Sequence, residues 1–311
     1  MGIINSLTAY FAHNHGGESV VVKAIEEIFL HGFLDTVKLV PFLFITYLIM
    51  EFIEHKAEEK TERFIKKAGK FGPAVGGLIG VIPQCGFSAA ASNFFAGRVI
   101  SVGTLVAVFL STSDEMLPIL ISESVPVTTL LVILGYKAIV GMIVGFIVDF
   151  VIKLLGKEKS EINIDAICEE DNCHCERGLF HSALHHTLTI TLFILIVTLI
   201  INALVFFIGE KNIALGISSV PILSHLVAAI FGLIPNCAAS VVLSTLCVEG
   251  LISAGVMTAG LFSGAGIGLL VLFRMNKNLK ENLTVTAILV ASGVVFGILL
   301  DLISATGIFG V

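Results

Sequence analysis

Hydrophobic positions along this chain form long blocks rather than the alternating pattern of a half-buried β-strand. Ten apolar segments can be marked, five in each half of the chain. They cover approximately residues 35–54, 72–82, 84–97, 99–121 and 126–152, then 186–208, 220–234, 236–249, 252–273 and 283–304. Runs of about 20 apolar residues are typical of helices that span a bilayer. The pattern predicts an all-α polytopic membrane protein.

Two pairs of these segments are short, and a similar sequence separates the members of each pair. Pro83-Gln84-Cys85 stands between the second and third segments, and Pro235-Asn236-Cys237 stands between the seventh and eighth. Proline removes a backbone donor and clashes with the preceding helical turn, so each pair is expected to break there. About 25 residues suit either one interrupted helix or one re-entrant helical hairpin.

The two motifs belong to an internal repeat with a constant shift of 152 residues. The shift places Pro83 on Pro235 and Cys85 on Cys237. It also matches Gly80 with Gly232, Ser88 with Ser240, Ser101 with Ser253, Gly103 with Gly255, Ser111 with Ser263, Gly141 with Gly293, Gly145 with Gly297 and Asp149 with Asp301. Duplicated halves are typical of secondary transporters.

The repeat divides the chain into four parts. We expect an amphipathic surface segment at 1–34, a first transmembrane repeat at 35–153, a linker at 154–182 and a second transmembrane repeat at 183–305.

Loop charge predicts the orientation of the two repeats. Basic residues gather at 56–70, 153–177 and 274–280, whereas the repeat equivalents of the first and third of these loops hold one lysine and none. Because basic loops face the cytosol, corresponding loops are expected on opposite sides of the membrane, which makes the repeats inverted. Each half then has three full spans and one re-entrant hairpin, with both termini external. Fully crossing short segments are the alternative.

Composition agrees with a membrane location. The 311 residues are 56% hydrophobic and 14% charged, with a formal net charge of −6. Soluble domains carry about 25% charged residues. The lipid bilayer is therefore an expected partner, nucleic acid is not, and an oligomer remains possible.

The hairpins suggest a binding site. Two hairpins that enter from opposite faces would bring Gln84 and Cys85 close to Asn236 and Cys237 near the middle of the membrane. Broken helix ends expose backbone groups that are tolerated only against protein or a wet cavity. We predict a metal site at these tips. The alternatives are that the cysteines only pack and that the amides cap the broken ends.

A second group of candidate ligands lies inside the fourth segment. Asp114 and Glu115 stand side by side there, although a charge near mid-bilayer costs at least about 2.5 kcal/mol. We expect them to coordinate a metal ion or a proton, with hydroxyl oxygens from Ser111, Thr112 and Ser113. A structural ion pair with Lys137 is the alternative reading.

The linker holds further metal-ligand types. Cys168, Cys173, His174 and Cys175 are secondary metal candidates, although their spacing is not that of a structural zinc site. An ordinary solvated acidic linker is an equally good interpretation.

Three motifs resemble a known family. "PQCGFS", "STSDEMLP" and "PNCAAS" are similar to motifs of bacterial ten-segment heavy-metal exporters, which are grouped with arsenical permeases and include members labelled manganese transporters. The resemblance implies efflux of a metal or metalloid ion across a bacterial inner membrane. It carries over to Gln84, Cys85, Ser111, Thr112, Ser113, Asp114, Glu115, Asn236 and Cys237.

Ligand chemistry leaves the ion open. Two cysteines favour soft species such as trivalent arsenic, whereas carboxylates and hydroxyls favour Mn²⁺. The chain has no Walker motif. We therefore expect a proton-coupled secondary transporter without a tightly bound cofactor.

Two other classes stay open as alternatives. An intramembrane thiol or carboxylate enzyme would need a base beside its nucleophile, and no histidine lies near either motif, so we do not expect an enzyme. A subunit of a larger permease would not need two inverted breaks.

Overall fold

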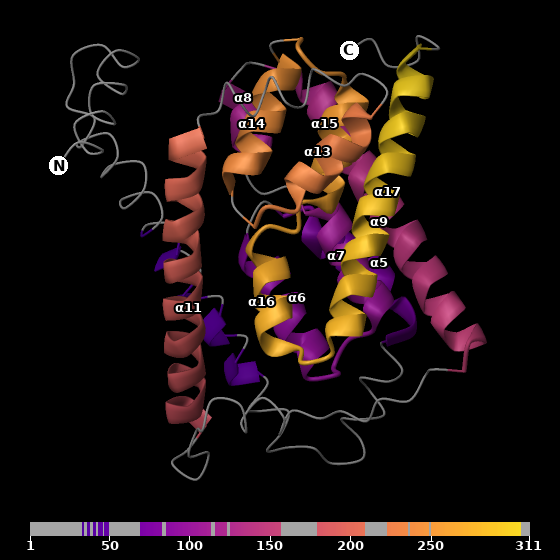
Figure 1. The fold of residues 1–311 in the computed structure, drawn as a ribbon. Helices are drawn as coiled ribbons and strands as arrows, with labels where there is room; N and C mark the ends of the chain where they lie inside the picture. Colours follow the sequence, from indigo (N-terminus) through magenta and orange to yellow (C-terminus); the bar gives the residue numbers. More distant parts are fainter. Residues whose placement is uncertain are drawn as a thin grey trace, which may run out of the picture.

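The computed structural model is helical, without a strand, over the residues that it describes (Figure 1). These are residues 69–82, 85–112, 116–122, 125–156, 179–208, 223–235, 237–248 and 250–305, together with helical positions between 33 and 49. A short 3₁₀ helix, η2 (Gly69–Phe71), precedes the first complete α-helix. The helices are α5 (Gly72–Gly80), α6 (Cys85–Ala96), α7 (Val102–Ser111), α8 (Met116–Ser122), α9 (Val127–Leu154), α11 (Leu179–Ile208), α13 (Ser224–Gly232), α14 (Cys237–Val248), α15 (Ala254–Ser263), α16 (Ile267–Met275) and α17 (Leu279–Ala305).

The short helices of the two halves correspond in position. α5, α6 and α7 begin and end 152 residues before α13, α14 and α15. The predicted breaks at Pro83 and Pro235 are present, because α5 and α13 end just before these motifs, and α6 and α14 begin at Cys85 and Cys237.

The short helices form two groups, one above the other in Figure 1. The lower group contains α5, α6 and α7 of the first half, and α16 of the second half packs against α6. The upper group contains α13, α14 and α15 of the second half, and α8 of the first half packs against α14. Each half therefore places one short helix in the group that the other half builds.

The long helices α9 and α17 run past both groups, in opposite directions. α9 ends low in Figure 1, whereas α17 ends at the top. The lower end of the molecule, where α6, α9 and α16 finish and α7 and α17 begin, carries Arg98, Lys153, Arg274, Lys277 and Lys280. We call it the basic end. The described turns at the other end contain no lysine or arginine.

Four stretches among the described residues are long and apolar enough to cross a membrane: Val127–Leu154, Ala183–Ile200, Ala254–Met275 and Leu279–Ser304. Large apolar side chains lie exposed along the long helices, including Ile139 and Phe150 on α9 and Leu302 on α17. A bilayer would cover these faces, as expected for a polytopic membrane protein.

The fourth segment of each half differs from the expected uninterrupted helix. α7 ends at Ser111 and α8 begins at Met116, while α15 and α16 are separated by Gly264–Gly266. Gly266 has φ 52° and ψ −138°, a conformation that side-chain-bearing residues rarely adopt. No proline marks either break, so sequence periodicity did not reveal them. α11 also begins earlier than expected, at Leu179.

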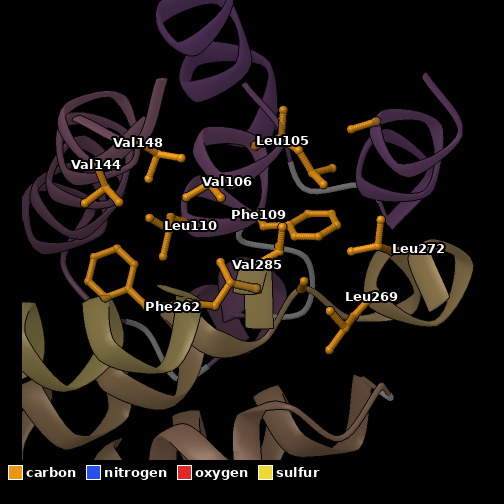
Figure 2. Packing of buried hydrophobic residues seen from close by; sticks show 14 of the residues in the cluster. Leu105, Val106, Phe109, Leu110, Val144, Val148, Phe262, Leu269, Leu272 and Val285 are labelled. Atoms are coloured by element: carbon orange, nitrogen blue, oxygen red, sulfur yellow. The ribbon is translucent and has the colours of Figure 1, made fainter. Parts of the chain in front are cut away.

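One core joins the two halves. Figure 2 shows Phe109 and Leu110 of α7 beside Phe262 of α15 and Val285 of α17, all within one cluster of buried residues. Close packing of such side chains gives many dispersion contacts, which hold helices together where lipid surrounds them. The halves therefore fold as one body rather than as two separable bundles.

Glycines let helix backbones touch inside each half. A Cβ on Gly103 of α7 would lie 2.1 Å from the carbonyl oxygen of Gly145 on α9, and a Cβ on Gly255 would lie 2.3 Å from that of Gly297 on α17. Small residues at such crossings are typical of membrane helix pairs, because close approach increases dispersion contacts.

The same aspartate arrangement fixes each of these crossings. Asp149 accepts hydrogen bonds from the Gly103 amide (2.8 Å) and the Ser101 hydroxyl (2.7 Å). Asp301 accepts the equivalent bonds from the Gly255 amide and the Ser253 hydroxyl, at 2.8 and 2.6 Å. Both carboxylates thus accept hydrogen bonds from donors at the start of a helix, where a negative charge is stabilised. This agrees with the interfacial or structural role that their position near span ends suggests.

Replacing Gly145 with Ala should destabilise the protein, because the new Cβ would meet the Gly103 carbonyl oxygen at 2.5 Å. We expect a loss of about 1–3 kcal/mol, seen as a lower midpoint of thermal unfolding in detergent. Gly135→Ala is the matched control on α9. Its Cβ meets nothing within 4 Å, so the better helix former should leave the midpoint unchanged or higher. Equal effects of both substitutions would contradict this packing.

Candidate functional site

The four helix breaks meet between the upper and lower groups. In Figure 1 the lower end of α14 and the upper end of α16 face each other at mid-height. A Cβ on Gly268, in the first turn of α16, would lie 2.7 Å from the Cβ of Ser88, in the first turn of α6. Helix starts from the two halves therefore come into contact in this region.

The C-terminal ends of the short helices also meet there in matched pairs. A Cβ on Gly80, the last residue of α5, would lie 2.1 Å from the hydroxyl oxygen of Ser111, the last residue of α7. In the second half, the Ser263 hydroxyl at the end of α15 donates to the carbonyl of Ala229 on α13 at 2.6 Å. Carbonyl groups that the breaks release thus gather on both sides of the region.

A buried lysine connects these ends across the two halves. Lys137 of α9 is fully buried, and its ammonium donates to the carbonyl oxygen of Thr112, just after α7, and to that of Leu261 in the last turn of α15, at 3.0 Å for the latter. The ammonium also lies 5.7 Å from the centre of the Phe262 ring. A cation is favoured at helix C-terminal ends, because the released carbonyls point toward it.

The site is asymmetric although its frame repeats. The repeat shift pairs Lys137 with Leu289, a fully buried apolar residue. The same shift pairs Asp114 with Gly266, whose conformation breaks the second-half helix. All the charge in these matched positions therefore belongs to the first half, as the sequence predicts.

The structure brings two of the predicted ligands to this region. Ser111 and Thr112 are buried, and their hydroxyls donate to the carbonyls of Ala107 (2.7 Å) and Val108 (2.8 Å). A hydroxyl that donates in this way keeps lone pairs that can still coordinate a cation. Their position agrees with the predicted role, which no contact in the structure tests.

The remaining predicted ligands cannot be placed. Cys85 and Cys237 begin α6 and α14, but their side chains lie outside the described part of the chain. The other predicted residues fall outside it altogether: Gln84, Ser113, Asp114, Glu115, Asn236, Cys168, Cys173, His174 and Cys175. Among the described residues, no group of three His, Cys, Asp or Glu side chains could hold a metal ion.

Sequence reasoning missed two contacts at the ends of the molecule. Arg98 pairs with Glu281 at 2.8 Å at the basic end, and it has φ 59° where its repeat-mate is Gly250, with φ 72°. His225 pairs with Asp301 at 2.9 Å at the other end. The repeat alignment held a signal for the backbone of Arg98, since a glycine aligned with an arginine in a tight turn indicates a left-handed conformation. It held no signal for either ion pair.

Lys137→Met should lower stability, because the carbonyls of Thr112 and Leu261 would lose their donor in a buried site. We expect a cost of about 1–3 kcal/mol. Leu289→Met, at the repeat-mate position, conserves apolar volume and should cost less than about 1.5 kcal/mol. Thermal unfolding of both variants in one detergent compares them. A midpoint for Lys137→Met at or above that of Leu289→Met would contradict the bridging role.

Comparison with known proteins identifies a family for this chain. A family model described as "Putative, 10TM heavy-metal exporter" matches residues 24–215, which is more than half of the chain. No curated protein and no solved structure matches the chain. The matched range includes two motifs of the first half, Gln84-Cys85 and the acidic pair Asp114-Glu115. The chain therefore belongs to this family of ten-segment membrane transport proteins.

Proposed function

We propose that this protein exports a heavy-metal or metalloid ion from a bacterial cell, by proton-coupled secondary transport, through a site where its broken helices meet. One observation carries the proposal: Lys137 joins the ends of α7 and α15, from opposite halves, in a buried region bordered by released backbone groups. Discontinuous helices that meet near mid-membrane form the ion and substrate sites of many secondary transporters.

The helix arrangement supports two inverted repeats. α5 and α6 both lie in the lower group, and α13 and α14 both lie in the upper group (Figure 1). A segment that enters and leaves at the same end is a re-entrant hairpin. α9 and α17 occupy matched positions in the repeats and run in opposite directions, as inversion requires. Each half then contributes one hairpin, with Cys85 and Cys237 at the tips.

Charge supports the orientation. Arg98, Lys153 and Lys277 lie at the basic end, and the positive-inside rule assigns that end to the cytosol. The end of α17 and the turn between α14 and α15 then face outward, and the C-terminus is external.

The contact of Lys137 with Thr112 supports proton coupling as the transport mechanism. Its ammonium bonds the carbonyl of Thr112, two residues before Asp114. A cation that enters beside this ammonium would be repelled by it unless a negative charge is also present. Exchange of the ion for protons on Asp114 or Glu115 would keep the charge of this buried region balanced.

The two cysteines favour a soft ion as cargo, such as trivalent arsenic or a thiophilic divalent metal. Manganese is the second candidate, because Ser111 and Thr112 supply hard oxygen atoms next to the acidic pair.

Purified protein in liposomes should move at least one of arsenite, Cd²⁺, Zn²⁺ and Mn²⁺ against an imposed proton gradient. Cys85→Ser and Cys237→Ser should each slow a soft ion by about tenfold or more, and slow Mn²⁺ less. Asp114→Asn should slow every transported ion.

Thr245→Val, also on α14 but on a different face of the helix from Cys237, is the matched control and should leave flux unchanged. Flux of no ion in the panel would contradict transport and favour an intramembrane enzyme or a permease subunit.

Accessibility tests the orientation. Lys277→Cys at the basic end and Leu251→Cys at the other end both replace exposed residues. A membrane-impermeant thiol reagent applied to intact bacterial spheroplasts should modify position 251 and not position 277, and inverted vesicles should give the reverse. The unsubstituted protein gives the background from native cysteines. Modification of position 277 in spheroplasts would overturn the assignment.

A further inference from the structure

The second helix of each hairpin carries a line of small polar residues that begins at its tip. On α6 these are Cys85, Ser88 and Ser92, and on α14 they are Cys237, Ser240 and Ser244. Residues three and seven apart lie on one face of a helix, and seven residues span about 10 Å. We call these lines the α6 stripe and the α14 stripe. They match under the 152-residue shift, and they run from the tips toward opposite ends of the molecule.

The α6 stripe faces α16 of the other half. Ser92 is fully buried, and its hydroxyl donates to the carbonyl of Gly268 at 2.6 Å. Close contact is possible because Gly268 has no side chain. Beside the stripe, Asn93 is also fully buried. Its carbonyl oxygen accepts from the Tyr47 hydroxyl at 3.3 Å, while its amide nitrogen has no hydrogen-bond partner among the described residues.

On the other side of the molecule α8 packs against α14, but no equivalent bond is present among the described residues. Ser244, the repeat-mate of Ser92, is fully buried, yet its hydroxyl has no partner among the described residues. The repeat-mate of Gly268 is Met116, a fully buried residue of α8. A methionine side chain stands here at the position where Gly268 allows close backbone contact with α6. Among the described residues, no carbonyl accepts from the Ser244 hydroxyl.

The unpartnered hydroxyl of Ser244 calls for an explanation. A buried hydroxyl or amide without a partner lowers stability, and most such groups in folded proteins are paired. Replacement of Ser244 by Ala would remove this cost at no loss of packing volume beyond one oxygen. The Ser244 hydroxyl lowers stability and lies on the face of α14 that leads to the tip. Coordination of a transported ion by this hydroxyl would explain its presence.

We propose that the two stripes are the two halves of the ion's path: the α6 stripe, against α16, leads from the basic end to the tips, and the α14 stripe, against α8, leads from the tips to the other end. Hydroxyl oxygens along each stripe, together with the Asn93 amide beside the α6 stripe, replace water around the ion as it passes. This inference rests on the proposed transport function. The Ser92–Gly268 bond closes the path on the basic side in this structure, and it breaks when that side opens.

The decisive variant is Ser244→Ala, with Ser92→Ala as its counterpart on α6. Each is reconstituted in liposomes, and Zn²⁺ and Cd²⁺ flux is measured beside the thermal unfolding midpoint in detergent. For Ser244→Ala we expect a midpoint equal to or above that of the unsubstituted protein, and flux reduced about tenfold. Stability and transport thus move in opposite directions, which loss of folding cannot mimic.

Thr191→Val on α11 is the matched control, because the Thr191 hydroxyl is also buried without a partner among the described residues but lies off both stripes. This variant should keep full flux. If Ser244→Ala raises the midpoint and leaves flux at the level of Thr191→Val, the path proposal is overturned. Absence of Zn²⁺ and Cd²⁺ flux in the unsubstituted protein would instead count against the proposed function.

A second readout tests the path whatever the flux result. Ser244→Cys should react with a small impermeant thiol reagent only from the side of the α14–α15 turn, and bound Cd²⁺ should slow this reaction. Ser92→Cys should react only from the basic side. Mass spectrometry of the modified peptide separates these sites from native cysteines. Failure of position 244 to react from either side overturns the proposal.

Discussion

Backbone contact at glycine is the constraint on which the rest of this structure depends. Helices in a bilayer gain little from hydrophobic burial against each other, so dispersion at close range must hold them together. Gly103 and Gly145 bring α7 onto α9, and Gly255 and Gly297 bring α15 onto α17, at distances that exclude a Cβ. These two crossings fix α7 against α9 and α15 against α17. The short helices can pack against these pairs, although alone they would have too few hydrogen bonds to be stable.

Breaking a helix inside a membrane releases donors and acceptors that water cannot reach. The protein answers this with side chains that act on backbone groups. Ser111 and Ser263 donate to nearby carbonyls, and Lys137 donates to the carbonyls of Thr112 and Leu261. Because Leu261 belongs to the other half, the lysine couples the position of one half to that of the other. Any ion that enters the region changes the electrostatic balance that this ammonium now maintains.

The helix frame is similar in the two halves, but several buried side chains are not. The aspartates Asp149 and Asp301 make the same bonds at both ends, which keeps the frame alike in the two halves. Lys137 and its apolar repeat-mate Leu289 differ, and so do Gly268 and Met116. A symmetric frame with unequal contacts can occupy two conformations of unequal stability.

The sequence alone determined the membrane class, the repeat and the breaks at Pro83 and Pro235, because hydrophobic length, a constant shift and proline act locally. Tertiary structure decided the further breaks: the one after Ser111 has no local signal, and the glycines at 264 and 266 allow the one after Ser263 without requiring it. The exchange of α8 and α16 between the two groups and the acceptors of Lys137 were also decided there. Lys137 and Leu261 are 124 residues apart, and only packing of the two halves brings them together. Local sequence determines which backbone donors and acceptors a helix break leaves unpaired, whereas the fold decides which distant side chain bonds to them.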